Sequence, residues 1–509
     1  MNFGTRTQNA IRNMTFGFLN KIFSLLLPFA IRTIIIYRLG YDYIGLGTLF
    51  TSILQVLSVA ELGFSSAIVF CLYKPVADDD RKEIIEWLQL FKCIYYAVGV
   101  VILILGLAVL PFLPKLIEGD VPADVNLYIL YLVYLSNSVI SYFVYSYKSV
   151  VLIVNQRRDM ISNIELFIGI IRSVVQIIVL LVTRNYYAYI VFIPVFTLCT
   201  NLVINQITNR FYPQFKVKGF FLNKEKLYSI SDQIKGLAIF RLSLVARNSF
   251  DSIILSALFG LTITTIYSNY YFIFASIGEF LAVILTSMSA GVGNSLVTES
   301  VEKNYEDHNR FDFYFMWIVG WCSICLLCLY QHFMKIWVGT GLMTSFWSMS
   351  MFCIYFYTIR MGEVRDLYSE AAGLWWKFRF VTIIEMLSNL GLNIALGILF
   401  GMNGILFATI FTTFVFSFIS ISRIAFREYF KRSVKEYFLN NLLYLVFTLL
   451  IAILTYCLCE SVIHEGIKGL IVKLVICIFI PNLIYLLLYF MLPKYRKYIK
   501  QILNKLLRL

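Results

Sequence analysis

The sequence is poor in charged residues: Asp, Glu, Lys and Arg make up 14% of its 509 residues, whereas globular proteins average about 25%. Hydrophobic residues make up 60%, and the mean hydropathy is +0.79. One buried core cannot enclose so much apolar surface, so a soluble domain is excluded. A disordered chain is excluded as well, because such chains are poor in aromatic residues and this one has 45 Phe and 34 Tyr.

Histidine is also scarce, and the three residues are His308, His332 and His464. None of them lies on the polar helix faces predicted below, and the predicted outer loops are short, the longest running from about 112 to 125. An integral-membrane enzyme would need catalytic groups near an outer face. The sequence therefore argues against an enzyme, and we expect no catalytic residue, no cofactor and no metal.

Long apolar stretches are what the sequence has in abundance. A bilayer core needs roughly 20 apolar helical residues per crossing, and backbone groups in lipid must be satisfied within the helix. We therefore predict an all-α integral membrane protein with about fourteen transmembrane helices. Their approximate ranges are 14–36, 44–72, 87–111, 126–147, 161–182, 187–206, 234–259, 263–290, 313–336, 346–370, 378–400, 403–422, 437–459 and 468–492.

The net charge of +14 reflects mainly Lys and Arg in the predicted loops. Loops on one side carry 29 of them and loops on the other side carry five. Cytoplasmic loops are enriched in Lys and Arg, so we expect both termini in the cytoplasm. The first apolar stretch carries Lys21 and Arg32 and is too long for a cleavable signal peptide.

Three short patterns recur at an offset of 218 to 220 residues: Ser58-x-x-Glu61 with Ser276-x-x-Glu279, Ile164-Glu165 with Ile384-Glu385, and Arg32-Thr-Ile-Ile-Ile with Asp251-Ser-Ile-Ile-Leu. Six spans separate the copies, so the repeats are parallel, an arrangement in which transporters bind substrate between two lobes. We expect a six-helix lobe over 1–206, a cytoplasmic linker over 207–233, a second six-helix lobe over 234–424, and helices 13 and 14 with a basic tail over 425–509.

Polar residues within several spans recur every three or four positions, which places them on one helical face. The stripes are Gly17, Lys21, Ser24, Pro28 and Arg32 in the first span; Thr48, Thr51, Gln55, Ser58, Glu61 and Ser65 in the second; Tyr134, Ser138, Ser141, Tyr145 and Lys148 in the fourth; and Ser162, Glu165, Gly169, Arg172 and Gln176 in the fifth. In a membrane, such faces are expected to line a central cavity.

Charges inside the first lobe favour an anionic ligand. The first lobe has four basic residues within its spans and two acidic ones. The basic residues are Lys21, Arg32, Lys92 and Arg172, and the acids are Glu61 and Glu165. A positive cavity of low dielectric attracts anions, and arginine suits phosphate. The second lobe is near balance, with Arg241, Arg247, Arg360 and Arg365 against Asp251, Glu279, Glu363 and Glu385.

Each of these residues also has a purely structural interpretation. Arg247 and Asp251, and likewise Arg360 and Glu363, have the spacing of pairs within one helix. Lys92, Arg241 and Lys473 could extend to the interface. Tyr134 and Tyr145 could stack on sugar rings or belong to interfacial aromatic belts. Cys322-x-x-Cys325-x-x-Cys328 lies on one helical face without an obvious fourth ligand, so we interpret the ten cysteines as packing residues.

Several segments resemble the bacterial Wzx-like flippases of polysaccharide repeat units (O-antigen or capsule type), which belong to the multidrug/oligosaccharidyl-lipid/polysaccharide exporter superfamily. The segments are Arg32 through Leu46, Leu57 through Gly63, Leu72 through Pro75, Asp251 through Leu255, Tyr267 through Tyr270, Gly291 through Asn294, Tyr368 through Gly373 and Gly401 through Gly404. The resemblance implies two six-helix lobes around a central cavity, plus two C-terminal helices.

The resemblance further implies that the protein moves undecaprenyl-diphosphate-linked oligosaccharide from the cytoplasmic to the outer leaflet of the bacterial cytoplasmic membrane by alternating access. Lys21, Arg32, Lys92 and Arg172 would then hold the diphosphate. Four acids are candidates for coupling to a proton or sodium ion: Glu61, Glu165, Asp251 and Glu279. Partners would be membrane lipid, the polymerase and other polysaccharide-assembly proteins, and not nucleic acid. A flippase for a lipid-linked peptidoglycan precursor and a multidrug/cation antiporter of the same superfamily are the alternatives.

Overall fold

The computed structural model describes residues 23–58, 64–215, 217, 219 and 223–506, and within these ranges the regular elements are helices, with no strand. The chain divides into two compact units, Met1–Thr265 and Ile266–Leu509. The division falls inside helix α10 (Lys224–Thr298) and not in the expected linker. The expected lobe boundaries stay a prediction.

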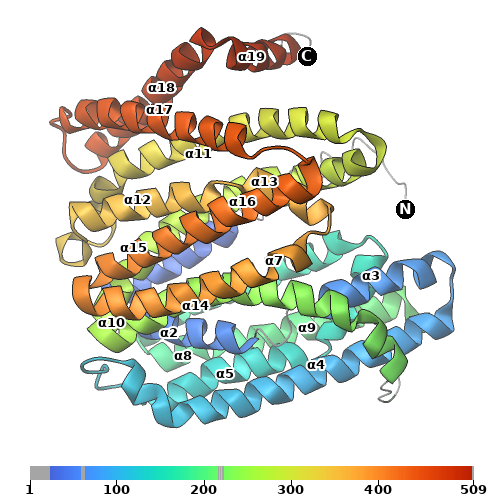
Figure 1. The fold of residues 1–509 in the computed structure, drawn as a ribbon. Helices are drawn as coiled ribbons and strands as arrows, with labels where there is room; N and C mark the ends of the chain where they lie inside the picture. Colours follow the sequence, from blue (N-terminus) through green and yellow to red (C-terminus); the bar gives the residue numbers. More distant parts are fainter. Residues whose placement is uncertain (1–22, 59–63, 216, 218, 220–222, 507–509) are drawn as a thin grey trace. The chain divides into compact units, whose positions relative to one another are not determined.

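The first unit begins with a helix over 23–38. It continues with α2 (Asp42–Leu57), α3 (Phe64–Ala77), α4 (Arg81–Val109), η2 (Leu110–Leu116), α5 (Leu127–Phe143), η3 (Ser146–Lys148), α6 (Ser149–Val154), α7 (Arg158–Thr183), α8 (Tyr186–Ile190), α9 (Phe192–Phe211), η4 (Pro213–Phe215) and the first part of α10 (Figure 1). Helix α5 packs on α4 and α9, and α9 packs on α7. Leu46, Phe50, Leu88 and Phe91 are fully buried in this unit's core.

The second unit contains the rest of α10. It continues with α11 (Val301–Trp337), η5 (Thr340–Leu342), α12 (Phe346–Arg360), α13 (Glu363–Ala371), α14 (Trp375–Phe400), α15 (Met402–Thr412), η6 (Thr413–Ser420), α16 (Ile421–Ala425), η7 (Phe426–Phe430), α17 (Lys435–Glu460), α18 (Gly466–Met491) and α19 (Pro493–Leu506). The segments η6 and η7 are π-helical. Helix α14 packs on α15, and α11 contacts α12, α17 and α18.

Nine helices of the described chain are long and apolar enough to cross a membrane, or ten if the bent pair α5 and α6 is one span. The all-helical, multi-pass membrane fold predicted from hydropathy is therefore confirmed. The predicted spans fall on observed helices, although the first and second lie partly outside the described residues, 234–259 and 263–290 both lie on α10, and 403–422 covers α15, η6 and the start of α16.

Two predicted spans are broken helices. The range 126–147 holds α5 and η3, and the range 346–370 holds α12 and α13. At the last break Gly362 has a φ of 90°, and a Cβ there would lie 2.8 Å from Arg365 Nη2. Glycine at this position thus allows both the turn and the close approach of the Arg365 guanidinium. Neither feature can be predicted from hydropathy.

Helix α18 is held on α11 by two indole hydrogen bonds, and α17 packs on both helices. Trp317 Nε1 donates to Asn482 Oδ1 at 3.1 Å, and Trp321 Nε1 donates to the carbonyl oxygen of Cys477 at 2.7 Å. The hydroxyls of Thr448 and Tyr485 lie 2.6 Å apart. Helices α17 and α18 are therefore integral to the second unit.

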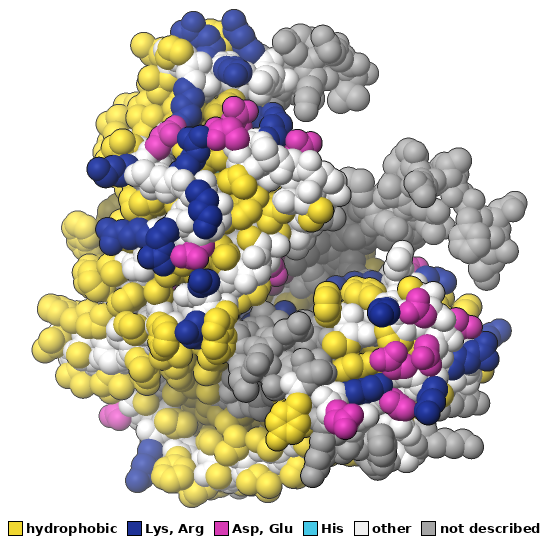
Figure 2. Space-filling model, turned by 45° about the vertical axis from the view of Figure 1, so that its right-hand side comes forward, with side chains coloured by type: hydrophobic (Ala, Val, Ile, Leu, Met, Phe, Trp, Pro, Cys, Tyr) yellow, Lys and Arg dark blue, Asp and Glu magenta, His cyan; other side chains and the backbone are white. Residues whose placement is uncertain are grey.

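Charged side chains gather at helix ends. Figure 2 shows a face on which Lys, Arg, Asp and Glu are frequent, beside surfaces that are mainly hydrophobic. Lys74, Arg81 and Lys82, around the turn from α3 to α4, are exposed, as are Lys431 and Arg432 before α17. This distribution suits helices that cross lipid, while the orientation in the membrane stays a prediction.

Candidate functional site

Two of the polar stripes come together in the first unit. The helix over 23–38 and α7 enclose a cavity of about 270 Å³. Its lining includes Ser24 and Pro28 from the first stripe and Glu165, Gly169 and Arg172 from the stripe on α7, together with Phe23, Leu27, Leu166, Ile170 and Ser173. Helical periodicity aligns each stripe, and the tertiary structure brings the described part of the first stripe and the stripe on α7 to one cavity.

Arg172 is the basic residue of this cavity. Its side chain is half-buried, and its buried Nε has no hydrogen-bond partner among the residues that the structure describes. Glu165 lies two turns earlier on α7, and it is exposed to the cavity. An unmade hydrogen bond from a buried polar group costs about 1–3 kcal/mol, and more for a charged one. The site is therefore suited to accept an anionic group beside Arg172.

The other predicted phosphate ligands lie elsewhere or outside the described residues. Arg32 is half-buried on the helix over 23–38, within electrostatic reach of Tyr186 and Tyr189, and it is not part of the cavity lining. Lys92 Nζ donates to the carbonyl oxygen of Gly219 at 3.3 Å, and Lys92 is not part of the cavity lining. Lys21 lies in the part of the chain that the structure does not describe.

The two candidate sugar-stacking tyrosines differ in environment. The Tyr134 hydroxyl is 2.9 Å from that of Tyr186, and its ring packs edge-on against Phe50 at 5.5 Å. Tyr145 is 42% exposed and sits at the bend after α5 with a φ of 54°. Tyr145 is thus available to a ligand, whereas Tyr134 is engaged within the first unit.

The three candidate coupling acids within the described residues differ in environment. Glu165 lines the cavity, and Asp251, on the first part of α10, is fully buried. Glu279, on the second part of α10, belongs to the second unit and is exposed. Glu61 falls outside the described residues.

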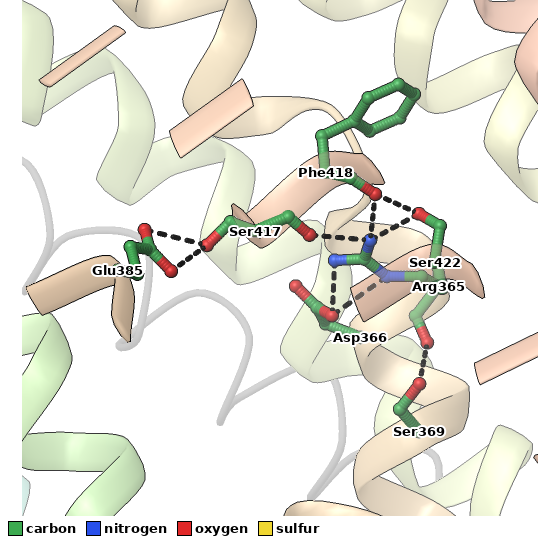
Figure 3. Close-up of polar contacts among 7 residues, drawn as sticks. All are labelled: Arg365, Asp366, Ser369, Glu385, Ser417, Phe418 and Ser422. Carbon is green, nitrogen blue, oxygen red and sulfur yellow. Dashed lines mark hydrogen bonds and ion pairs between the residues drawn. The ribbon is translucent and has the colours of Figure 1, made fainter. Parts of the chain in front are cut away.

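Two arginines predicted within the spans of the second unit, Arg360 and Arg365, have protein partners. Arg360 Nη1 lies 2.6 Å from Glu363 Oε1, the pairing that the spacing suggested. Arg365 is 1% exposed and pairs with Asp366 at 2.6 Å (Figure 3). Its Nη1 also donates to the carbonyl oxygens of Ser417 and Phe418, at 2.9 and 3.1 Å, on the π-helical segment η6.

The repeat-related glutamates also differ. Ser417 Oγ lies 3.0 and 2.8 Å from the two carboxylate oxygens of Glu385 (Figure 3). Glu385 is 5% exposed, whereas Glu165, its match in the first half, faces a cavity. The first unit thus combines Arg172 with an open cavity, whereas Arg360, Arg365 and Glu385 of the second unit are engaged by other protein groups.

Sequence reasoning missed two features. Lys148, at the end of the polar stripe of the fourth predicted span, is 4% exposed and donates to Asn209 Oδ1 and to the carbonyl oxygen of Phe215, both at 3.2 Å. Cys328 meets Cys459 and Cys477, from α17 and α18, within 4.8 Å. The Cys-x-x-Cys-x-x-Cys pattern on α11 was the available signal for the second feature, but its partners lie far along the chain.

Comparison with models of known protein families gives no match, and comparison with curated proteins gives none. Solved structures are similar in fold. The lipid II flippase MurJ in an inward closed conformation is 12% identical, with a TM-score of 0.68, over 94% of this chain and 99% of that one. The Vibrio cholerae MATE transporter VcmN in the bent form is 12% identical, with a TM-score of 0.51, over 84% and 95%.

A MATE structure in a bent conformation is 14% identical, with a TM-score of 0.51, over 81% of this chain and 93% of that one. At these identities the similarity concerns the fold. The chain therefore has the all-helical membrane fold that the lipid II flippase MurJ and MATE transporters share.

Proposed function

We propose that the protein is a flippase that moves undecaprenyl-diphosphate-linked oligosaccharide repeat units across the bacterial cytoplasmic membrane for surface polysaccharide synthesis. The substrate enters from the cytoplasm and leaves at the outer leaflet by alternating access. Two independent features support this: the fold shared with a lipid-linked-substrate flippase and the resemblance of the sequence motifs to polysaccharide-repeat-unit flippases.

The observation that carries the proposal is Arg172 in the cavity of the first unit. A guanidinium offers a planar fork of donors that matches phosphate oxygens, and the buried Nε of Arg172 lacks an acceptor among the described residues. A diphosphate supplies both the acceptor and the negative charge. Ligand pockets commonly measure about 300–1,000 Å³, so this cavity of about 270 Å³ suits the diphosphate and not the whole oligosaccharide.

The remaining predicted residues complete the proposal. Arg32, Lys92 and Lys21 contribute positive field around the diphosphate, and Tyr145 stacks on a sugar ring. A proton or a sodium ion drives the cycle through Glu165, since an ionisable group within a membrane helix marks an ion pathway by default. Glu61, Asp251 and Glu279 are the other acids of this proposal, and both termini lie in the cytoplasm.

Reconstitution tests the assignment. The purified chain is placed in proteoliposomes with lipid-linked oligosaccharide, and externally exposed sugar is measured over time. Arg172→Ala should lower both transport and the binding of soluble diphosphate-bearing analogues at least about tenfold, the effect of losing roughly 1.5–3 kcal/mol of charge-assisted hydrogen bonding. Arg172→Lys should recover part of the activity, because it restores the charge but not the fork.

Arg184→Ala is the matched control. Arg184 follows the last residue of α7 and is exposed, away from the cavity lining. The Arg184→Ala variant should transport substrate like the wild type. Unchanged binding and transport in Arg172→Ala would remove the diphosphate assignment.

A lipid-linked peptidoglycan precursor is the second candidate substrate, favoured by the fold similarity to the lipid II flippase. The same vesicles loaded with that precursor decide between the two. Faster movement of the precursor than of the oligosaccharide would favour the second candidate. Transport of a cationic dye would favour an antiporter of the MATE kind, which the cavity arginine disfavours.

A further inference from the structure

Three buried cysteines from three different helices meet in the second unit. Their sulfur atoms, from Cys328 on α11, Cys459 on α17 and Cys477 on α18, all lie within 4.8 Å of one another. The Sγ atoms of Cys459 and Cys477 are 3.8 Å apart. Cys325, one turn before Cys328, lies with its Sγ 3.8 Å from the carbonyl oxygen of Cys477.

The spacing of the sulfur atoms matches shared coordination of a metal ion. Two thiolates on one tetrahedral zinc, with Zn–S bonds of about 2.3 Å, stand about 3.8 Å apart. A disulfide would bring the sulfurs to about 2.05 Å. Isolated buried cysteines act as small hydrophobes, but hydrocarbon packing does not require thiols from three helices to converge on one point.

The charge around the cluster suits a divalent ion. Zinc with three thiolates carries one net negative charge, which is costly in a low-dielectric interior unless it is paired. Lys473 lies one turn before Cys477 on α18, with a side chain 10% exposed, and is within electrostatic reach of Cys459 and Cys477. Its other partner, Glu460 at 3.4 Å, is 56% exposed, so solvent screens that pair.

A route to the cluster also exists. A cavity of about 190 Å³ is lined by Cys328, Gln331, His332, Tyr456, Glu460 and Lys473, among others. It reaches the cluster at Cys328 and is large enough to hold a water molecule, with polar partners among its lining residues. A fourth ligand can therefore come from a water in this cavity.

We propose that Cys328, Cys459 and Cys477 form a thiolate site for one Zn²⁺, with water as the fourth ligand, and that the ion fastens α17 and α18 to α11. Each thiol gives up its proton to solvent on binding, so the site forms without any oxidant. The ion would reinforce the contact that Trp321 already makes with the carbonyl oxygen of Cys477. This role in holding the C-terminal helix pair is separate from substrate transport.

Metal analysis of the full chain tests the site. The protein is purified under reducing conditions without chelators, incubated with Zn²⁺ and desalted, and zinc is measured by mass spectrometry. The wild type should hold one zinc per chain, and Cys477→Ala, Cys459→Ala and Cys328→Ala should hold none. Cys353→Ala is the matched control, because Cys353 is a buried thiol of the same unit on α12, outside the cluster, and should keep the ion.

Two further measurements do not depend on whether the cysteine-cluster variants fold. Co²⁺ replacing zinc in the wild type should give thiolate-to-metal charge-transfer absorption, and a membrane-permeant zinc chelator should lower the Tm of the wild type and of Cys353→Ala. A wild type that holds no zinc, or a Tm that does not respond to the chelator, overturns the proposal. Copper(I) bound in preference at these sulfurs, or a Cys459–Cys477 disulfide found after thiol trapping in cells, overturns the zinc assignment.

Discussion

Arg365 donates from Nε and from Nη2 to the same carboxylate oxygen of Asp366, at 3.0 and 2.6 Å. Its remaining terminal nitrogen, Nη1, is held by the hydroxyl of Ser422 and by two carbonyl oxygens of η6. Arg172 is also an arginine within a membrane helix, yet its buried Nε has no partner in the described part of the chain. Both residues are arginines within predicted membrane spans, yet their expected roles differ: Arg365 is structural and Arg172 binds a ligand.

Arg365→Met should therefore destabilise the protein strongly. The substitution removes the guanidinium donor from the Ser417 carbonyl oxygen and the Ser422 hydroxyl, and the cation beside Asp366, whereas the Phe418 carbonyl oxygen keeps the Ser422 hydroxyl as a donor. Each unsatisfied buried group costs about 1–3 kcal/mol, and more when the bond involved a charge. We expect a loss of about 3 kcal/mol or more, measured as a lower midpoint of thermal unfolding in detergent. Arg172→Met should change that midpoint little, and equal losses in the two variants would contradict the division of roles.

Gly260→Ala should destabilise the first unit. Gly260 interrupts α10 with φ 77° and ψ −174°, a conformation that is essentially restricted to glycine and costs other residues about 1–3 kcal/mol. A Cβ there would also overlap the carbonyl oxygen of Glu118. The expected result is lower yield and a lower unfolding midpoint.

Gly291→Ala is the control for this substitution. Gly291 lies in the same helix, and a Cβ there would meet nothing within 4 Å. Since alanine is favoured over glycine in a helix by up to about 1 kcal/mol, the control should be neutral or stabilising. A stable Gly260→Ala protein would show that the break in α10 tolerates a side chain.

Substitutions of Tyr145 and of Tyr134 should have different effects, one on transport and the other on stability. Tyr145→Asn, a residue that tolerates the left-handed conformation, should reduce transport of the sugar-bearing substrate about two- to tenfold, the value of one aromatic contact of roughly 0.5–1.5 kcal/mol. Tyr134→Phe should instead cost about 1 kcal/mol of stability, because it removes the hydrogen bond to Tyr186, and should leave substrate preference unchanged.

The exposed Tyr128 on α5 provides the comparison for general interfacial effects. Tyr128→Ala should transport normally. If it matches Tyr145→Asn, the loss at Tyr145 reflects an aromatic belt and not sugar stacking.

Glu165→Gln should uncouple transport from an ion gradient while the protein stays folded. Glu165 shares the cavity with Arg172, so loss of its charge should strengthen the positive field and preserve substrate binding. The measurement compares flipping in proteoliposomes with and without an imposed proton or sodium gradient. Glu118→Gln, at an exposed acid after η2, should respond to the gradient like the wild type, and a gradient response retained in Glu165→Gln would exclude this residue as the coupling group.

Local pattern was enough to predict the helices and the faces on which polar residues lie. Hydropathy over about 20 residues reports whether a helix can cross lipid, and periodicity reports which side chains share a face. The stripes containing Pro28 and Arg172 were therefore predictable. The breaks at Tyr145 and Gly362 were not, because they depend on single backbone conformations that change mean hydropathy very little.

Which residues meet across helices was decided by the tertiary structure alone. The sequence places Cys328 on a cysteine-bearing face but does not indicate that Cys459 and Cys477 complete it. The sequence likewise cannot distinguish Arg172 from Arg365. The groups that accept hydrogen bonds from Arg365 include backbone carbonyls of a π-helical turn, and these leave no side-chain pattern in the sequence. The scarcity of charge determined that this chain enters a membrane, and the packing of helices distant in sequence determined which of its few buried charges remain available to a ligand.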